Sequence, residues 1–265
     1  MSNIDAVNAL ITAINFDRFD EIEKSHNPNV LFTSFRGPIL HSSVAVTDWH
    51  RTFLRDYADC NYTDLEYLEE GDAVAVRANI EAKGYSWRPF TQRVIDVFDM
   101  AQGGVAERRL YGMLADVELD KPATAAMTNA LEFRGGSPSA TKAAIDGFFG
   151  AFLAGDKETM LGFLADKATL VDSVYGIANG ASNIIDLLNS IPRPAFGSYR
   201  LTRSIAGAKD GFVELAIDPS RPRRADWVRM VDDKILVIET YWMFREIGIK
   251  PESRDRHIKS AIMPI

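Results

Sequence analysis

The feature that most constrains the fold of this chain is an internal repeat of domain length. When the sequence is shifted by 139 residues, Thr33 falls on Asp172 and the apolar patterns of the two halves coincide. After a shortening of nine residues the shift becomes 130, and Asp96 then falls on Asp226. A repeat of this length is a whole domain and not a solenoid unit. The sequence therefore predicts two similar domains, in which each residue with chemical potential can be compared with its twin.

Composition excludes several classes of protein. The 265 residues suffice for two domains of ordinary size, and a net charge of −7 argues against a nucleic-acid-binding protein, which needs a basic face. A single cysteine, Cys60, excludes an internal disulfide and a cysteine metal cluster. The N-terminus is acidic and amphipathic, unlike a signal peptide, and no apolar run approaches the roughly 18–20 residues of a membrane span. We expect a cytoplasmic protein that binds neither nucleic acid nor a membrane.

Helices come first and strands afterwards in each half, which is the pattern of an α+β fold. Apolar periodicity predicts two domains at 1–118 and 139–247, joined by a linker at 116–138. The predicted helices span 4–15, 17–22 and 43–57 in the first half, and 140–153, 156–163 and 181–190 in the second.

Five strands are predicted in each half, with tight hairpin turns before the last strand at Gln102-Gly103-Gly104 and Asp232-Asp233-Lys234. The predicted strands span 30–35, 65–68, 73–82, 90–100 and 105–114, and then 169–175, 199–206, 212–217, 223–231 and 235–244.

This order resembles the nuclear transport factor two-like superfamily, which includes SnoaL-like polyketide cyclases and ketosteroid isomerases. The first half looks SnoaL-like in GPILH at 37–41, and in RVIDVF at 93–98 leading to GVAE at 104–107. The resemblance implies two tandem cone-shaped domains, each with three helices packed on a curved antiparallel β-sheet. We expect the first domain to be mainly structural, because Thr33, at the position of the candidate base Asp172, cannot act as a base.

The second half more closely resembles ketosteroid isomerase. KATLVD at 167–172 is similar to the strand that carries the family's general base, and ADWV at 225–228 to the strand that carries its protonated aspartate. KILVIETYW at 234–242 is similar to the last strand. The resemblance implies a ligand pocket in this domain, with catalytic roles for Asp172 and Asp226.

The residues themselves allow two interpretations of Asp226. Strand alternation places it on one face with Val228 and Met230, where burial would raise the pKa of its carboxyl group. A protonated carboxyl could donate a hydrogen bond to a developing enolate oxygen, as in ketosteroid isomerase. The alternative is a structural aspartate, which we favour for Asp96 because its partner position is Thr33, which cannot act as a base.

Asp172 ends a predicted strand and could move a proton between carbon atoms. The alternative is a residue that caps a turn, since Asp-Ser pairs often end strands. If their environments separate the pKa values of the two carboxyl groups, Asp172 and Asp226 would form an acid–base pair.

One position departs from the isomerases, whose first helix carries an oxyanion-binding tyrosine. Phe148 stands there and cannot donate, so Tyr175, Tyr199 and Tyr241 are candidates to replace it. The last-strand aspartate of related hydrolases and cyclases is also replaced, by Leu110 and Thr240.

We therefore predict that the second domain binds a small apolar carbonyl compound and acts as an isomerase-, cyclase- or dehydratase-like enzyme without cofactor or metal. The alternative is a non-catalytic binding or scaffold protein. Both faces of the strands are apolar, which predicts an internal pseudo-dimer of the two halves and allows a homodimer. The predicted ligand-binding residues are aromatic: Phe148, Phe152, Tyr175, Trp227 and Trp242.

Overall fold

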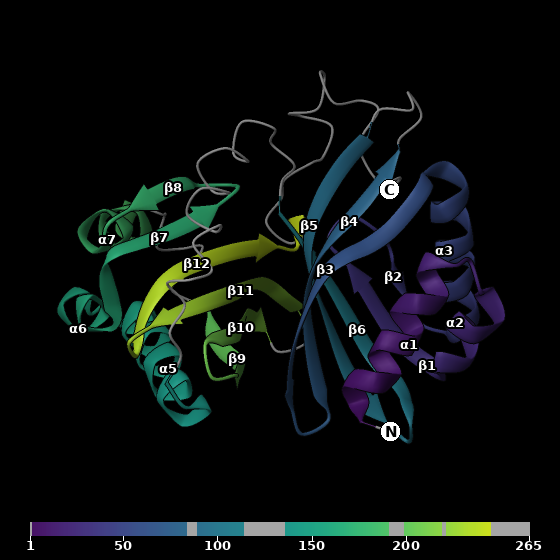
Figure 1. Ribbon diagram of the computed structural model, residues 1–265, viewed down its shortest axis with the longest axis horizontal. Coiled ribbons are helices and arrows are strands. Elements are labelled where there is room, and N and C mark those ends of the chain that lie inside the picture. The colour runs from purple at the N-terminus through teal and green to yellow at the C-terminus, as the bar shows by residue number, and fades with distance from the viewer. Residues whose placement is uncertain (1, 84–88, 114–135, 191–198, 219–220, 245–265) are drawn as a thin grey trace. The chain divides into compact units, whose positions relative to one another are not determined.

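The computed structural model describes residues 2–83, 89–113, 136–190, 199–218 and 221–244 (Figure 1). The chain divides into two compact units. The N-terminal unit comprises Met1–Gly112 with Met243–Ile265, and the C-terminal unit comprises Met113–Trp242. The predicted linker, apart from 136–138, and the tail after 246 lie outside the described residues.

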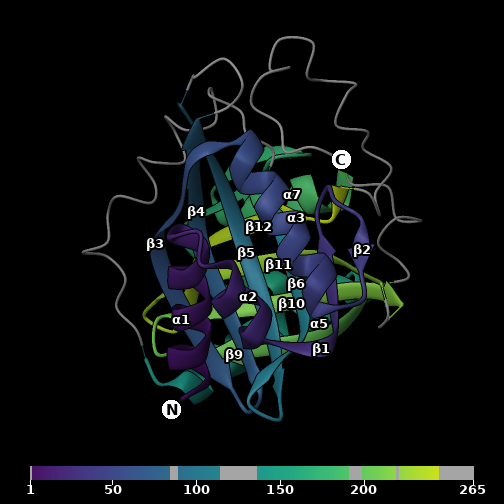
Figure 2. The same ribbon diagram turned by 90° about the vertical axis from the view of Figure 1, so that its right-hand side faces the viewer.

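Three helices cover one face of the N-terminal sheet (Figure 2). Helix α1 (Asn3–Asn15) begins with a reciprocal capping box between Ser2 and Asp5, and α3 (Ser43–Asp56) begins at Ser42, whose hydroxyl accepts from a backbone N–H. Between them lies α2 (Phe19–Ser25). Helix α1 buries one apolar stripe, formed by Val7, Leu10, Ile11 and Ile14.

The N-terminal sheet has the order β3-β4-β5-β6-β1, with β2 at the end of β1. Strands β3 to β6 are antiparallel neighbours in sequence, whereas β1 runs parallel to β6. The strands are β1 (His26–Ser34), β2 (Ile39–Leu40), β3 (Ala58–Glu70), β4 (Ala73–Lys83), β5 (Pro89–Ala101) and β6 (Gly104–Gly112).

The C-terminal unit repeats this arrangement. Helix α5 (Pro138–Ala154) packs against β9 and β10 (Figure 1). Its C-terminal cap is Gly155, whose φ of 74° is left-handed and suits glycine. Helices α6 (Lys157–Phe163) and α7 (Ala181–Ser190) follow. The sheet order is β9-β10-β11-β12-β7-β8, with β7 parallel to β12. Its strands are β7 (Leu164–Asp172), β8 (Gly176–Asn179), β9 (Arg200–Ala206), β10 (Asp210–Asp218), β11 (Arg221–Val231) and β12 (Lys234–Trp242).

Turn geometry and strand register support the predicted repeat. Gln102 and Gly103 have positive φ, as do Asp232 and Asp233, which lie 130 residues later. Two successive positive φ values are typical of the hairpin turns that match strand twist. Asp96 pairs with Leu110 and Asp226 with Thr240, so the offset of 130 holds across the last two strands of both sheets.

The predicted twin of Asp172 is wrong by one residue. Strands β1 (26–34) and β7 (164–172) begin and end 138 residues apart, so Ser34 and not Thr33 corresponds to Asp172. The loop between the first two helices holds three residues in the first copy and two in the second, which accounts for the slip.

The predicted α+β class is confirmed, with three helices on a curved, mostly antiparallel sheet in each unit. Two short strands, β2 and β8, were not predicted, and β7 ends at Asp172 and not at 175. Phe244 packs edge to face on Phe35 and belongs to the N-terminal compact unit. The predicted domain bounds of 1–118 and 139–247 stay predictions. The pseudo-dimer and the homodimer stay predictions.

Candidate functional site in the C-terminal unit

The two predicted catalytic aspartates lie on one face of the C-terminal sheet. Thr240 on β12 pairs with Asp226 on β11 and with Asp172 on β7. Side chains of residues paired across neighbouring strands point to the same face, and two strand spacings separate the outer backbones by about 10 Å. All three residues are buried. The fold therefore brings both carboxyl groups into one interior row.

Asp226 is held by an arginine on its own strand. Arg224 lies two residues earlier, so strand alternation places it on the same face. Its Nε lies 2.8 Å from Oδ2 and its Nη2 2.8 Å from Oδ1, and the Thr240 hydroxyl lies 2.6 Å from Oδ1. An arginine side chain stays protonated and can only donate. Both oxygens of Asp226 therefore accept hydrogen bonds, whereas the sequence predicted that this group would donate one to a ligand.

Asp172 receives its hydrogen bonds on one oxygen. Its Oδ1 accepts from the backbone N–H groups of Val174 and Tyr175, at 2.8 and 3.1 Å, and from the indole N–H of Trp242 at 3.1 Å. Its Oδ2 receives no hydrogen bond from any residue that the structure describes. Asp172 thus caps the turn after β7, and within the described part of the chain its second oxygen accepts no hydrogen bond.

Burial raises the pKa of the Asp172 carboxyl group above its ordinary value, although the Arg224 charge and the three N–H donors act in the opposite direction. A carboxylate whose charged form is disfavoured by burial binds a proton more readily than a solvated one. The site thus combines a carboxyl group of raised pKa with the charge of the Arg224 guanidinium.

Aromatic rings surround the Arg224 guanidinium. Its Cζ lies 5.5 Å from the Trp242 ring centroid and 5.6 Å from that of Phe152, within cation–π range. Tyr175 meets Trp242 edge to face at 5.8 Å. Phe152 and Tyr175 are only partly buried, whereas Arg224 and Trp242 are fully buried. Three of the five predicted ligand-binding residues therefore gather around this arginine.

The other two predicted ligand-binding residues lie elsewhere. Trp227 follows Asp226 directly, so its side chain points to the opposite face of β11. Phe148 is buried on α5 and packs edge to face on Phe149 at 5.2 Å. Of these two, Trp227 is misplaced for contact with the carboxyl row, and Phe148 forms part of the helix core.

Two of the candidate tyrosines lie near Arg224. Burial raises the pKa of Tyr175 and of Tyr199, and the charge of Arg224 lowers both in part. Tyr241 lies on the opposite face of β12 from Thr240 and donates to Glu239 at 2.8 Å. Tyr175 and Tyr199 therefore remain candidates for a hydroxyl donor at the site.

The N-terminal interior also buries an aspartate–arginine pair. Arg108 on β6 donates to Asp96 on β5 through Nη2 at 2.7 Å and through Nε at 3.1 Å. Its Nη2 also lies 3.1 Å from the Tyr62 hydroxyl, and its Nη1 lies 2.9 Å from His50 Nε2. All four side chains are buried. Neither Arg108 nor Arg224 was predicted from the sequence.

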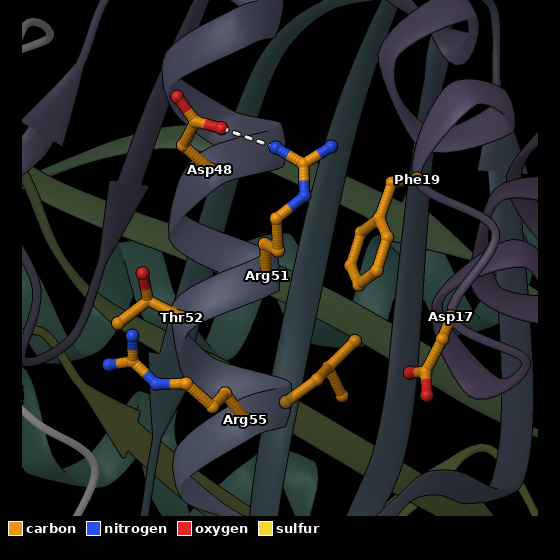
Figure 3. Close-up of a pocket in the computed structure, with 7 residues that line it drawn as sticks. Asp17, Phe19, Asp48, Arg51, Thr52 and Arg55 are labelled. Atoms are coloured by element: carbon orange, nitrogen blue, oxygen red, sulfur yellow. Dashed lines mark hydrogen bonds and ion pairs between the residues drawn. The ribbon is translucent and has the colours of Figure 1, made fainter.

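A surface depression of about 530 Å³ lies between α2 and α3 of the N-terminal unit (Figure 3). Arg51 forms an ion pair with Asp48 at 2.6 Å and stacks over the Phe19 ring at 4.8 Å. Thr52 and Asp17 also line the hollow. Nothing in its lining forms a nucleophile–base or acid–base pair, so we assign it no catalytic role.

Comparison with known proteins identifies the N-terminal domain. Residues 7–108 match the family model of the SnoaL-like domain. No curated protein matches the chain.

Solved structures with low identity also match. They include an NTF2-like protein of unknown function from Burkholderia pseudomallei, at 18% identity, 42% of this chain, 92% of that chain and a TM-score of 0.40. A provisionally named polyketide cyclase from Pseudomonas putida matches at 14% identity, 43% of this chain, 93% of that chain and a TM-score of 0.40. A protein with a ketosteroid isomerase-like fold from Catenulispora acidiphila matches at 12% identity, 40% of this chain, 83% of that chain and a TM-score of 0.38.

No group of three His, Cys, Asp or Glu side chains within the described ranges is arranged to hold a metal ion. No helix among the described residues is long and apolar enough to cross a membrane.

Proposed function

We propose that the C-terminal unit binds a small, largely apolar carbonyl compound and moves a proton on it, with Asp172 as the base. One observation carries this proposal: three N–H donors hold Asp172 Oδ1, while Oδ2 receives no hydrogen bond from the described residues. A carboxylate fixed through one oxygen presents the other in a defined direction, as proton transfer requires.

In the proposed reaction, Asp172 Oδ2 takes a proton from the carbon next to the carbonyl group. The electron pair of that C–H bond forms a C=C bond to the carbonyl carbon, and the π pair of the carbonyl group moves onto its oxygen to give an enolate. The positive charge of Arg224 stabilises this oxygen, and the protonated Asp172 then returns the proton to another carbon. The proton balance closes without a co-reactant, so no cofactor is needed.

Asp226 has a positioning role in this proposal. Both of its oxygens accept from Arg224, and Oδ1 also accepts from Thr240. These bonds fix the guanidinium on the same face as Asp172. The partly buried rings of Phe152 and Tyr175 would contact the apolar body of the ligand.

A second candidate is a non-catalytic binding protein. Its support is that Asp226 is engaged on both oxygens, as Asp96 is in the SnoaL-like domain, where we assign the pair a structural role. In that case Arg224 would hold an interior together and take no part in chemistry.

Deuterium uptake from D2O tests the proposal. A panel of β,γ-unsaturated ketones, 1,3-dicarbonyl compounds, steroid enones and polyphenols is incubated with the wild type and with Asp172→Asn. Asparagine keeps an acceptor for the three N–H donors but removes the base. We expect uptake to fall about 10²- to 10⁴-fold, the usual contribution of a positioned base.

Ser34→Ala is the matched control, because it alters the corresponding position of the other unit, and it should exchange at the wild-type rate. Equal rates in the wild type and in Asp172→Asn would rule out Asp172 as the base. A panel compound that raises the melting temperature but never exchanges would favour the non-catalytic candidate.

A further inference from the structure

The C-terminal unit has two aromatic rings at its candidate site, and the N-terminal unit has glycine at both corresponding positions. The offset of 130 between the last two strands of the two sheets makes Gly112 the counterpart of Trp242. The offset of 138 between β1–β2 and β7–β8 makes Gly37 the counterpart of Tyr175. The edge-to-face pair of the C-terminal unit therefore cannot form from the same positions in the N-terminal unit.

The Phe35 ring fills the space beside Gly112. A Cβ atom on Gly112 would lie 2.6 Å from Cδ2 and 2.7 Å from Cε2 of this ring, well inside the roughly 3.5–4.0 Å of a carbon–carbon contact. Phe35 follows Ser34, the last residue of β1, and its side chain is fully buried. The ring thus takes the room that the side chain of Trp242 occupies in the C-terminal unit, and it can do so only because residue 112 is glycine.

A second ring reaches Phe35 from the other end of the chain. Phe244 belongs to the N-terminal compact unit, is fully buried and packs edge to face on Phe35, with the ring centroids 5.6 Å apart. Arg36 contacts both rings, because its Cζ lies 5.3 Å from the Phe244 centroid and 5.8 Å from the Phe35 centroid. Both units therefore have an edge-to-face aromatic pair beside a guanidinium, but in the N-terminal unit one ring comes from outside the repeated domain.

We propose that the N-terminal unit has a binding site for an uncharged aromatic ring and that Phe244 occupies it as an internal ligand. The edge-to-face contact with Phe35 and the Arg36 guanidinium hold this ring. Both interactions depend on the ring and not on its link to the backbone, so a free aromatic molecule can make them. Without the Phe244 ring, the site should accept benzene, which engineered apolar cavities bind. This inference does not depend on proton transfer by the C-terminal unit.

Thermal denaturation of the full chain with and without benzene tests the proposal on Phe244→Ala. Because this substitution leaves a cavity, we expect the melting temperature to fall by at least about 5 °C. Benzene should then raise the melting temperature of the variant by at least about 2 °C more than that of the wild type. Phe16→Ala is the matched control, since Phe16 lies in the same unit but is 67% exposed, and it should behave as the wild type does in both respects.

A crystal structure of Phe244→Ala soaked in benzene gives the location of the bound ring. We expect benzene in contact with the Phe35 ring and the Arg36 guanidinium. An unchanged melting temperature in Phe244→Ala, a response to benzene no larger than that of the wild type, or benzene bound only elsewhere would each overturn the proposal. Phe244→Val leaves a smaller cavity and is measured in parallel, so the same comparison holds if Phe244→Ala does not fold.

Discussion

The interiors of the two units each bury an aspartate–arginine pair, but the arginines come from different positions. Both bury an aspartate at the same point of the same strand, Asp96 and Asp226, and both pair it with arginine. In the N-terminal unit the arginine is Arg108 on the neighbouring strand, and in the C-terminal unit it is Arg224 on the same strand. A buried carboxylate thus needs a guanidinium, but not at a fixed position.

Each unit has an apolar residue at the position where the other unit has its buried arginine. At an offset of 130, Val94 stands where the C-terminal unit has Arg224, and Ile238 stands where the N-terminal unit has Arg108. The end of β7 also carries a second carboxylate, Asp172, where the N-terminal unit has Ser34. This difference is why we propose chemistry for the C-terminal interior and a structural role for the N-terminal one.

We expect the largest effect on stability from breaking either buried aspartate–arginine ion pair. Arg108→Leu and Arg224→Leu each leave a buried carboxylate without its counter-charge, so we expect each to lower the free energy of unfolding by about 3–5 kcal/mol. Urea denaturation of the two variants measures this. A loss below about 1 kcal/mol in either would mean that the aspartate of that unit is not held by its arginine.

Acid should affect the N-terminal interior through His26. Its pKa is lowered from 6.5 to about 4, mainly by burial, so the unfolded chain binds the proton more tightly than the folded one. The stabilisation of the folded chain by the neutral His26 ring is therefore fully present above pH 6.5 and is lost as the pH falls from 6.5 to 4. The loss amounts to about 3 kcal/mol at 1.36 kcal/mol per pKa unit.

The measurement is the free energy of unfolding between pH 4 and 7 in the wild type and in His26→Leu. The variant should lose less stability over this range. Parallel curves would show that His26 does not remain neutral in the folded chain.

Trp242→Phe sharpens the role assigned to the C-terminal interior. It removes one of the three donors to Asp172 Oδ1 and keeps an aromatic ring. A hydrogen bond to a charged group contributes about 1.5–3 kcal/mol, so the pKa of Asp172 should rise by about one to two units. The acidic limb of the exchange rate against pH should move upward accordingly, and an unmoved limb would mean that Trp242 does not act on the base.

Ser34→Ala should have the smallest effect. The Ser34 hydroxyl accepts from the Gly37 backbone N–H at 2.7 Å, as Asp172 does from the turn after β7. Its loss should cost about 1 kcal/mol. Denaturation measures this cost, and a loss of several kcal/mol would show that the N-terminal turn depends on more than this cap.

The fold could be predicted because its signals are local. Apolar periodicity, tight turns such as Asp232-Asp233 and the repeat itself fix the order of elements. The twin of Asp172 was wrong because a loop that is one residue longer leaves the apolar pattern intact, whereas register is a property of the paired strands.

The site could be predicted only in part. Strand ends and aromatic positions in the sequence predicted four residues that lie around one group: Asp172, Phe152, Tyr175 and Trp242. That group, Arg224, was missed although its place two residues before Asp226 put both on one face. Arg108 could not be found in this way, because it reaches Asp96 from a neighbouring strand.

The central claim is that proton transfer belongs to the C-terminal interior alone. Deuterium uptake by Arg108→Leu/Asp96→Leu and by Arg224→Leu/Asp226→Leu tests it most directly, because replacing both members of a buried pair by apolar residues is often neutral for stability. We predict uptake within about twofold of wild type for the first variant and at least about 100-fold slower uptake for the second. Loss of uptake in the first variant, or its survival in the second, would contradict the claim.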